Sequence, residues 1–327
     1  MRAAVHRQYG PPEVVHVEDV PKPTPKPDEA LVRVHAATVS AADWRLRKAD
    51  PFFVRLIMGL RRPKKNNILG MDFAGIVEAV GSSVTNFRPG DAIFGGTGMS
   101  LGGHAEYACV RTDLAVGLKP ENITMEQASA VFFGGITAIN FLKRGKIQAG
   151  QRVLVYGASG SVGTWTVQLA KHYGAHVTAV CSTANLELVK SLGADEVVDY
   201  TKQDFSSAGR IYDMVLDTVG RTGFRRTLRC LKRGGAYVVT GGSATIPSIL
   251  GSILGSLCLS LTKTARPVAG VAKPSVEDFA LITELLASGQ LHPVIERCYS
   301  LDEIAEAHRH AESGRKKGQI VIVIAKP

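Results

Sequence analysis

The chain has 327 residues, a formal net charge of +10, and 45% hydrophobic and 21% charged residues. This length exceeds the size at which a single core usually stops growing, so it predicts two domains, and the composition excludes an intrinsically disordered chain. A basic surface attracts nucleic acid, acidic membranes and anionic cofactors alike, so the charge alone selects none of them. The basic clusters have neither interleaved aromatic residues nor zinc-finger spacing, so a nucleic-acid partner is not expected.

The cysteine pattern limits the compartment and the chemistry. The five cysteines are scattered and never form a Cys-x-x-Cys pair: Cys109, Cys181, Cys230, Cys258 and Cys298. This usage argues against a disulfide framework and against a cysteine-rich zinc site. The segment Met1–His6 carries no apolar signal core. Together these features predict a cytoplasmic protein in a reducing compartment.

The first 120 or so residues are predicted to be mostly β-structure. Four alternate prolines between 21 and 27 separate short strand-like segments such as 30–35 and 75–80, and Gly81 and Gly90 mark turns. From about residue 150 the pattern changes to short apolar runs alternating with helical stretches. The runs are 153–156, 176–181, 196–199, 213–217 and 236–240, with helices to 173, over 185–192 and ending near 232. This alternation predicts a doubly wound parallel sheet.

The C-terminal part adds a helix over 276–288, a strand from Val294, a helix opened by the capping-box pattern Ser300-x-x-Glu303, and a strand over 319–324. Before it lies the most apolar run of the chain, 246–261. The run is broken by Pro247 and is too short for a transmembrane helix, so no membrane association is expected. Its apolar residues recur at helical spacing, and it is interpreted either as core or as a cover for an apolar ligand.

A glycine-rich turn follows the apolar run 153–156. It reads Gly157-Ala158-Ser159-Gly160-Ser161-Val162-Gly163 and leads into a helical stretch. In such a turn one glycine lets the backbone approach a pyrophosphate and another lets the helix pack on the strand, while the helix N-terminus offers N–H groups to the phosphates. Gly160 and Gly163 fit these two roles. The surrounding βαβ series predicts a dinucleotide site.

The sequence resembles the zinc-independent quinone oxidoreductase-like branch of the medium-chain dehydrogenase/reductase superfamily, including its reticulon-4-interacting-protein-like members. The residues that match the signature of this branch are Gly150-Gln151, Leu154, Ala158-Ser159, Gly160, Gly163, Gln168 and Lys171. Ser161 stands where the signature has glycine. The resemblance implies a GroES-like, mostly-β catalytic domain formed by residues 1–124 and 269–327 around a Rossmann domain at 125–268.

The resemblance also implies which residues form the site. It assigns catalytic positions to Ser40, Asp72 and Thr137, although an ordinary helix hydroxyl at 137 and a salt-bridged carboxylate at 72 are alternatives, and Ser40 replaces the usual asparagine. The residues expected to contact the cofactor are Thr137, Ser159, Gly160, Ser161, Val162, Gly163, Ser182, Thr183, Tyr200, Thr218, Val219, Gly241 and Gly242. His104, in a Gly-Gly-His turn, is interpreted as a structural residue or as a proton donor.

No metal is expected. Zinc-dependent relatives use a cysteine and a Gly-His-Glu motif, whereas this chain has Ser40 near the first position and Gly70-Met71-Asp72 at the second. The cysteines of a structural zinc lobe are also missing, because Cys109 is the only one between Asp91 and Val110. Without zinc, oxidation of an alcohol is disfavoured relative to reduction of an electron-poor acceptor.

The residues at the end of the second apolar run, 176–181, favour NADPH over NADH as the cofactor. NAD-selective sites place Asp or Glu there, and this chain has Cys181-Ser182-Thr183. Ser182 and Thr183 can donate hydrogen bonds to a phosphate, or they can simply cap the next helix. The family places a tyrosine after the third strand, and Tyr200 matches it.

The predicted function is NADPH-dependent transfer of hydride to a quinone or an α,β-unsaturated carbonyl compound. Two alternatives stay open: a 2-enoyl-thioester reductase, and a non-catalytic NADPH-binding regulatory or RNA-binding protein. A homodimer is expected, because Rossmann domains of this superfamily commonly pair edge to edge.

Overall fold

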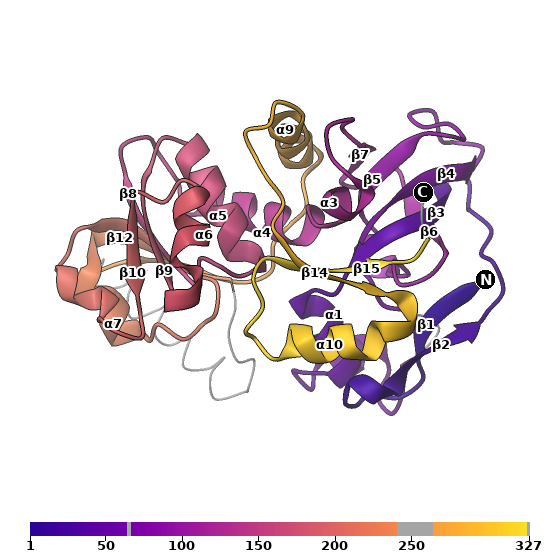
Figure 1. Ribbon diagram of the computed structural model, residues 1–327, viewed down its shortest axis with the longest axis horizontal. Coiled ribbons are helices and arrows are strands. Elements are labelled where there is room, and N and C mark those ends of the chain that lie inside the picture. Colours follow the sequence, from indigo (N-terminus) through magenta and orange to yellow (C-terminus); the bar gives the residue numbers. More distant parts are fainter. Residues whose placement is uncertain (64–66, 241–263, 326–327) are drawn as a thin grey trace. The chain divides into compact units, whose positions relative to one another are not determined.

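The computed structural model describes residues 1–63, 67–240 and 264–325, and the chain forms two compact units (Figure 1). Unit 1 combines Met1–Phe133 with Pro274–Pro327, and unit 2 is Gly134–Lys273. The sequence predicts domain limits at 124/125 and 268/269, and the contacts divide the chain at 133/134 and 273/274. The apolar run 246–261 and the expected cofactor residues Gly241 and Gly242 lie outside the described residues.

Unit 1 consists mainly of antiparallel strands. Its seven-stranded sheet has the order β14-β15-β3-β4-β5-β7, β6 also pairs with β3, and β1 and β2 form a separate ribbon. Because β15 pairs with β3, strands from both ends of the chain share one sheet. The strands are β1 (Arg2–His6), β2 (Val15–Asp19), β3 (Glu29–Thr38), β4 (Asp72–Val80), β5 (Ala92–Gly96), β6 (Tyr107–Arg111), β7 (Val116–Leu118), β14 (Ile295–Ser300) and β15 (Gln319–Val323).

Helices cover this sheet. Figure 1 shows α10 beside β14 and β15, and its buried side chains Ile304 and Ala307 share a core cluster with Ile320 and Ile322 of β15. The predicted capping box is present, since the Ser300 N–H donates to the Glu303 carboxylate at 2.8 Å. The helices are α1 (Ala41–Lys48), α2 (Val54–Met58), α3 (Met125–Ser129), α9 (Val276–Ala287) and α10 (Ile304–Glu312), and α4 (Phe132–Arg144) continues from unit 1 into unit 2.

Unit 2 is a parallel six-stranded sheet. Its strands are β8 (Arg152–Tyr156), β9 (His176–Cys181), β10 (Glu196–Asp199), β11 (Tyr212–Asp217), β12 (Leu231–Val239) and β13 (Arg266–Val268), arranged β10-β9-β8-β11-β12-β13. In sequence order this is 3-2-1-4-5-6, which is the Rossmann arrangement, and it confirms the predicted doubly wound sheet. Figure 1 shows α5 (Ser161–His172) and α6 (Leu186–Ser191) on one side of the sheet and α7 (Phe224–Cys230) on the other.

One boundary in unit 2 differs from the prediction. The sequence predicts a helix that ends near 232 and a strand that starts at Ala236, whereas α7 ends at Cys230 and β12 begins directly at Leu231. The partner of Tyr212 is Leu231 and the partner of Met214 is Ala236, so the register shifts between them. The basic and glycine residues 232–235 are accommodated as an irregularity within the strand, and residue type alone does not reveal such an irregularity.

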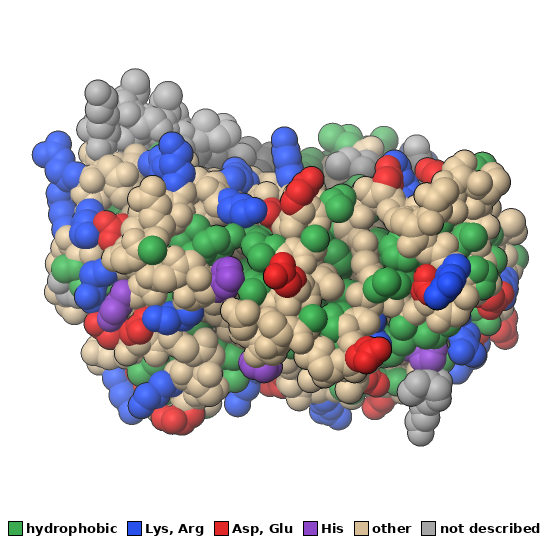
Figure 2. Space-filling view, turned by 90° about the horizontal axis from the view of Figure 1, so that it is seen from above, with side chains coloured by type: hydrophobic (Ala, Val, Ile, Leu, Met, Phe, Trp, Pro, Cys, Tyr) green, Lys and Arg blue, Asp and Glu red, His purple; other side chains and the backbone are tan. Residues whose placement is uncertain are grey.

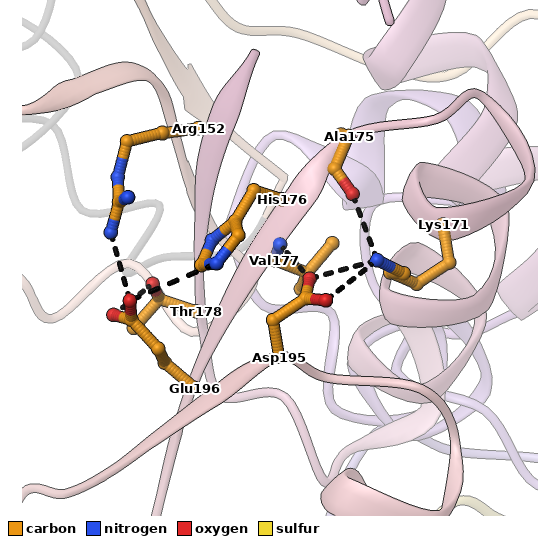
Figure 3. Close-up of polar contacts among 8 residues, drawn as sticks. All are labelled: Arg152, Lys171, Ala175, His176, Val177, Thr178, Asp195 and Glu196. Carbon is orange, nitrogen blue, oxygen red and sulfur yellow. Dashed lines mark hydrogen bonds and ion pairs between the residues drawn. The ribbon is translucent and has the colours of Figure 1, made fainter. Parts of the chain in front are cut away.

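Polar contacts connect the amino ends of β8, β9 and β10 (Figure 3). Asp195 accepts hydrogen bonds from the Lys171 ammonium at 2.8 Å and from the Val177 N–H at 2.7 Å, and thereby ties α5 to β9. Glu196 accepts from Arg152 at 2.9 Å and from Thr178 at 3.2 Å. These contacts lie at the amino ends of the strands, so they support the sheet from the edge opposite the glycine-rich turn.

We expect Asp195→Ala to lower the free energy of unfolding by about 1–3 kcal/mol, because the Val177 N–H and the Lys171 ammonium lose their acceptor. Burial alone would raise the pKa of Asp195, but the hydrogen bonds from Lys171 and Val177 hold it below its usual value. A lowered folded-state pKa stabilises the fold above the unfolded pKa, about 4, and this contribution is lost as pH falls through the folded value. Urea unfolding at pH 7 and pH 3 measures both effects.

A matched control is Asp302→Ala, which removes an exposed ion pair with Arg2. Exposed pairs contribute little, so this variant should change stability by less than about 1 kcal/mol. If Asp195→Ala destabilises the protein no more than Asp302→Ala does, or if its effect is as large at pH 3 as at pH 7, the proposed fastening of the sheet is wrong.

Candidate functional site

The glycine-rich turn joins β8 to α5 at the carboxyl edge of the parallel sheet. A methyl group at Gly163 would lie 2.1 Å from the carbonyl oxygen of Gly157 and 2.7 Å from Ala158 backbone carbon atoms, so α5 approaches the strand end as closely as glycine allows. A methyl group at Gly160, the N-cap of α5, would lie 3.5 Å from its nearest atom, the carbonyl oxygen of Gly157. Gly163 therefore has the helix-packing role that the sequence predicts, and Gly160 leaves open space at the helix N-terminus.

The turn presents donors suited to phosphate. The first N–H groups of a helix have no intrahelical acceptors, and the helix dipole places partial positive charge there. Ser161 begins α5, and its hydroxyl oxygen is buried without a hydrogen-bond partner among the described residues. An anionic group bound at this N-terminus would supply the acceptor. The residues present thus fit the pyrophosphate of a dinucleotide.

The loop after β11 lies against this turn. Thr218 donates its hydroxyl hydrogen bond towards the carbonyl oxygens of Tyr156, at 3.0 Å, and Gly157, at 3.2 Å. A side chain at Gly157 would lie 2.4 Å from Val219. Because β8 and β11 are neighbours at the point where the strand order reverses, the structure brings Thr218 and Val219 to the expected topological switch point.

Asp217 organises this loop, and sequence reasoning gives it no role. One of its carboxylate oxygens accepts from the N–H groups of Val219, at 2.9 Å, and Gly220, at 2.7 Å. The other accepts from the N–H and the hydroxyl of Thr222. Four hydrogen bonds to one buried carboxylate fix the path of the chain immediately after β11.

The ends of β9 and β10 carry a second group of polar residues. The Asn185 amide nitrogen donates to the hydroxyl oxygens of Ser159, at 3.0 Å, and Ser182, at 3.2 Å, and so links the glycine-rich turn to the end of β9. Thr183 instead donates its hydroxyl proton to the Asp199 carboxylate. Sequence reasoning missed Asn185 and Asp199; the available signal was their position, three residues after Ser182 and immediately before Tyr200.

Tyr200 follows Asp199 and is exposed. Its ring lies 6.1 Å from that of Tyr156, measured between centroids, and half of its surface is accessible to solvent. Val219 is also a largely exposed apolar residue, at 39%. Thr137 lies within α4 and is half-buried. The structure thus collects the glycine-rich turn, Ser182, Thr183, Tyr200, Thr218 and Val219 at the carboxyl edge of one sheet.

In unit 1, Ser40 acts locally as a helix cap. Its hydroxyl donates to the Asp43 carboxylate at 2.5 Å, and its N–H donates to the same carboxylate at 2.7 Å, which makes a capping box at the start of α1. The other Asp43 oxygen accepts from the Gly70 N–H at 2.9 Å. Ser40 is fully buried, so its hydroxyl proton is used within the protein. The expected catalytic role of Ser40 remains a prediction.

Asp72 begins β4 and is fully buried. Thr38 donates a hydrogen bond to its Oδ2, and its Oδ1 has no partner among the described residues. Burial raises the pKa of Asp72 to about 8, against the opposing effect of the Thr38 hydrogen bond. The carboxyl group of Asp72 therefore keeps its proton near neutral pH.

Lys316 interacts electrostatically with Asp72, and His104 contacts Thr38, the partner of Asp72. Burial lowers the pKa of Lys316 to about 8, although the Asp72 carboxyl opposes this effect, and the Lys316 ammonium has no hydrogen-bond partner in the described part of the chain. From the sequence, the Lys316 side chain is expected at the surface, because it lies in the basic run Arg315–Lys317. The His104 Nε2 lies 2.9 Å from the Thr38 carbonyl oxygen, so His104 contacts the end of β3. Its alternative role as a proton donor stays a prediction.

Residues 1–63, 67–240 and 264–325 contain no group of three or more His, Cys, Asp or Glu side chains arranged to hold a metal ion. Within the same ranges no helix is long and apolar enough to cross a membrane. The four cysteines that are described, Cys109, Cys181, Cys230 and Cys298, are free thiols.

Comparison with known proteins identifies the family. Residues 26–120 match the family described as "Alcohol dehydrogenase GroES-like domain", and residues 192–322 match "Zinc-binding dehydrogenase". The chain is 32% identical to a 2-methylene-furan-3-one reductase from Solanum lycopersicum, over 98% of this chain and 79% of that protein. It is 33% identical to the chloroplastic quinone-oxidoreductase QR1 of Triphysaria versicolor, over 98% of both. The chain belongs to the quinone oxidoreductase-like branch of the medium-chain dehydrogenase/reductase superfamily.

A solved structure agrees with this assignment. The Escherichia coli quinone oxidoreductase complexed with NADPH superposes with a TM-score of 0.82 at 25% identity, covering 99% of this chain and 100% of that one. This member of the branch is therefore an oxidoreductase with a GroES-like domain and a Rossmann domain, and it binds a nicotinamide cofactor.

The two glycines of the turn give a matched pair of variants. Gly163→Ala should destabilise the protein by about 1–3 kcal/mol, because the methyl group would overlap backbone atoms that cannot move independently. Gly160→Ala should leave the thermal midpoint nearly unchanged, since its methyl group would make one ordinary contact, 3.5 Å from the Gly157 carbonyl oxygen, but it should weaken cofactor binding by obstructing the approach of phosphate. Thermal unfolding without cofactor and titration calorimetry with cofactor measure the two effects. Equal destabilisation by both substitutions would contradict the assigned roles.

Proposed function

We propose that this protein transfers hydride from NADPH to a quinone or an α,β-unsaturated carbonyl compound. The observation that carries the cofactor assignment is the end of β9, where Ser182 and its partner Asn185 stand in place of the carboxylate of an NAD-selective site. A hydroxyl at this position suits a 2′-phosphate, which a carboxylate would repel. The relatives named as a furanone reductase and a quinone oxidoreductase support the acceptor class.

The bound cofactor supplies the hydride. The protein binds and orients the cofactor and the acceptor, and it excludes water from the site. We propose that the glycine-rich turn holds the pyrophosphate, that Tyr200 and Val219 provide apolar contact to the adenosine and pyrophosphate regions, and that Thr137 contacts the nicotinamide end. Gly241 and Gly242, outside the described residues, are proposed for the same end on the resemblance alone. Ser40 caps α1, and Asp72 keeps a proton near neutral pH.

Reduction of a quinone or an enone needs one proton for each hydride. A carboxylic acid with a pKa near the working pH is a suitable general acid, because it is protonated and still able to release the proton. We therefore propose Asp72 as a proton store for the reduction. A quinone or an enolate intermediate can also take a proton from water, so loss of Asp72 should slow the reaction without abolishing it.

The decisive experiment follows NADPH oxidation with 9,10-phenanthrenequinone, a simple enone and a crotonyl thioester as acceptors. We expect turnover with the first two and little with the thioester. Preferential reduction of the thioester would favour the enoyl-thioester reductase alternative. Tight NADPH binding without turnover on any acceptor would identify a non-catalytic binding protein.

Two controls sharpen this test. Dialysis against a chelator should leave the rate unchanged, because an electron-poor acceptor needs no Lewis acid, and stoichiometric zinc in active protein would refute zinc independence. If Asp72 supplies the proton, kcat should fall as pH rises through about 8, and Asp72→Asn should remove this pH dependence while leaving NADPH affinity unaltered.

The face of the molecule shown in Figure 2 gives no support to the RNA-binding alternative. On the face shown in Figure 2, Lys and Arg side chains are scattered among acidic and neutral ones and do not gather into one basic patch. A cytoplasmic location remains our proposal; the free thiols support a reducing compartment.

We also propose a homodimer formed through unit 2. The outer strands of its described sheet are β10 and β13, and an outer strand is a template for pairing with a second copy. Light scattering at micromolar concentration should give twice the chain mass of 34.9 kDa. A mass equal to that of one chain would contradict the dimer.

A further inference from the structure

Among the hydroxyl groups at the carboxyl edge of the unit 2 sheet, four contact two buried side chains that determine which way their protons point. The hydroxyls belong to Ser159, Ser182, Thr183 and Thr201. The organising residues are Asn185 and Asp199, which are 8% and 5% exposed. Asn185 contacts the two serines and Asp199 the two threonines.

A hydroxyl has one proton and can accept as well as donate, so an internal partner that uses one capacity leaves the other for a ligand. The Asn185 amide nitrogen donates to Ser159 and Ser182, at 3.0 and 3.2 Å. Both serine oxygens are therefore acceptors towards the protein, and each keeps its own proton. These two serines are left as donors towards a bound molecule.

The threonines have the opposite arrangement. Hydrogen bonds from Thr183 and Thr201 lower the pKa of Asp199, so its carboxylate is ionised and can only accept. It accepts from the Thr183 hydroxyl, from the Thr201 hydroxyl at 2.6 Å and from the Thr201 N–H at 2.9 Å. The Lys202 ammonium, 3.8 Å away, is mostly exposed. The Thr183 proton is thus used within the protein. The Thr183 oxygen also lies 3.3 Å from the Thr201 oxygen, but the Thr201 proton goes to Asp199, so Thr183 is left as an acceptor.

We propose that Asn185 and Asp199 are positioning residues that determine cofactor specificity. Asn185 makes Ser182 a donor to the 2′-phosphate, and Asp199 makes Thr183 an acceptor, which cannot donate to that phosphate. This proposal rests on the proposed NADPH-dependent function. It revises the expectation that both hydroxyls donate to phosphate. A phosphate group near neutral pH has oxygens that accept, so it pairs with Ser182, whereas the 2′-hydroxyl of NADH carries a proton that Thr183 can accept.

The test measures dissociation constants for NADPH and NADH by titration calorimetry, without turnover. Ser182→Ala should weaken NADPH binding about tenfold or more, because a hydrogen bond to a charged group is lost, and should change NADH binding little. Thr183→Val, which keeps the shape of the side chain, should leave NADPH binding within about twofold and weaken NADH binding instead. Asn185→Ala should reproduce Ser182→Ala, because the orientation of the serine is lost.

Asp199→Asn should have the opposite effect, because it changes the hydrogen-bonding role of Thr183. An amide at this position can donate to Thr183, which frees the Thr183 proton, so NADPH binding should tighten relative to NADH. Ser191→Ala is the matched control, since the Ser191 hydroxyl donates to the Leu188 carbonyl within α6 and is remote from this network. It should alter neither constant, and thermal unfolding of each variant verifies that it is folded.

The outcomes separate this inference from the proposed function. If the parent protein binds neither nucleotide, the proposed function fails. If the parent binds NADPH and Thr183→Val weakens NADPH binding as much as Ser182→Ala does, the proposed function stands. The assignment of Ser182 as donor and Thr183 as acceptor is then overturned. The Ser182 and Thr183 variants decide this even if the Asn185 or Asp199 variants fail to fold.

Discussion

The cofactor region depends on one contact, the close approach of Gly163 in α5 to the backbone of Gly157 and Ala158. A Cβ atom at Gly163 would lie 2.1 Å from a carbonyl oxygen, so no other residue permits this approach without movement of the backbone. The contact fixes how closely the start of α5 approaches the end of β8. The same turn brings Gly157 against Thr218 and Val219, and therefore couples the loop after β11 to the position of the helix.

Parallel pairing then assembles the remaining site residues. Asp199 is the register partner of Cys181, so the last residue of β10 lies beside the last residue of β9. This register is what lets Thr183 reach Asp199 and lets the Tyr200 N–H donate to the Cys181 carbonyl at 3.1 Å. Asn185 adds the link back to Ser159 of the glycine-rich turn. Three strand ends that are distant in sequence thereby form one polar surface with a defined set of donors and acceptors.

Much of this fold could be predicted from the sequence, because its strongest signals are local. The strand–glycine–helix turn at 153–171, the alternation of strands and helices in unit 2, and the capping box at Ser300 depend on residues close together in the chain, and the structure confirms them. The start of β12 at Leu231 was missed because it is set by pairing with Tyr212, which lies 19 positions earlier (231 − 212). Asn185 and Asp199 were missed for the same reason. The contact of Asn185 with Ser159 needs the turn after β8 beside the end of β9, and the contact of Asp199 with Thr183 needs β9 and β10 to pair.

The family resemblance assigns a site role to Ser40, for which the structure shows a structural contact as well. Ser40-Ala-Ala-Asp43 is a readable capping-box pattern, and the structure shows Ser40 in that role. His104 supports the Thr38 carbonyl, and Thr38 in turn donates to Asp72. These contacts form a chain of positioning residues, from His104 through Thr38 to the carboxyl group of Asp72.

Asp72, at the end of that chain, and Lys316 are two buried ionisable groups that interact electrostatically. The Asp72 Oδ1 and the Lys316 ammonium each lack a hydrogen-bond partner in the described part of the chain. A buried polar atom left unpaired costs about 1–3 kcal/mol, and more when it is charged, so evolution for stability alone would replace such a pair with apolar side chains. Burial moves the pKa of each group to about 8, the carboxyl upward and the ammonium downward. A proton on Asp72 is therefore held weakly enough to leave near neutral pH, which is the property that reduction of an enone or a quinone requires of its proton source.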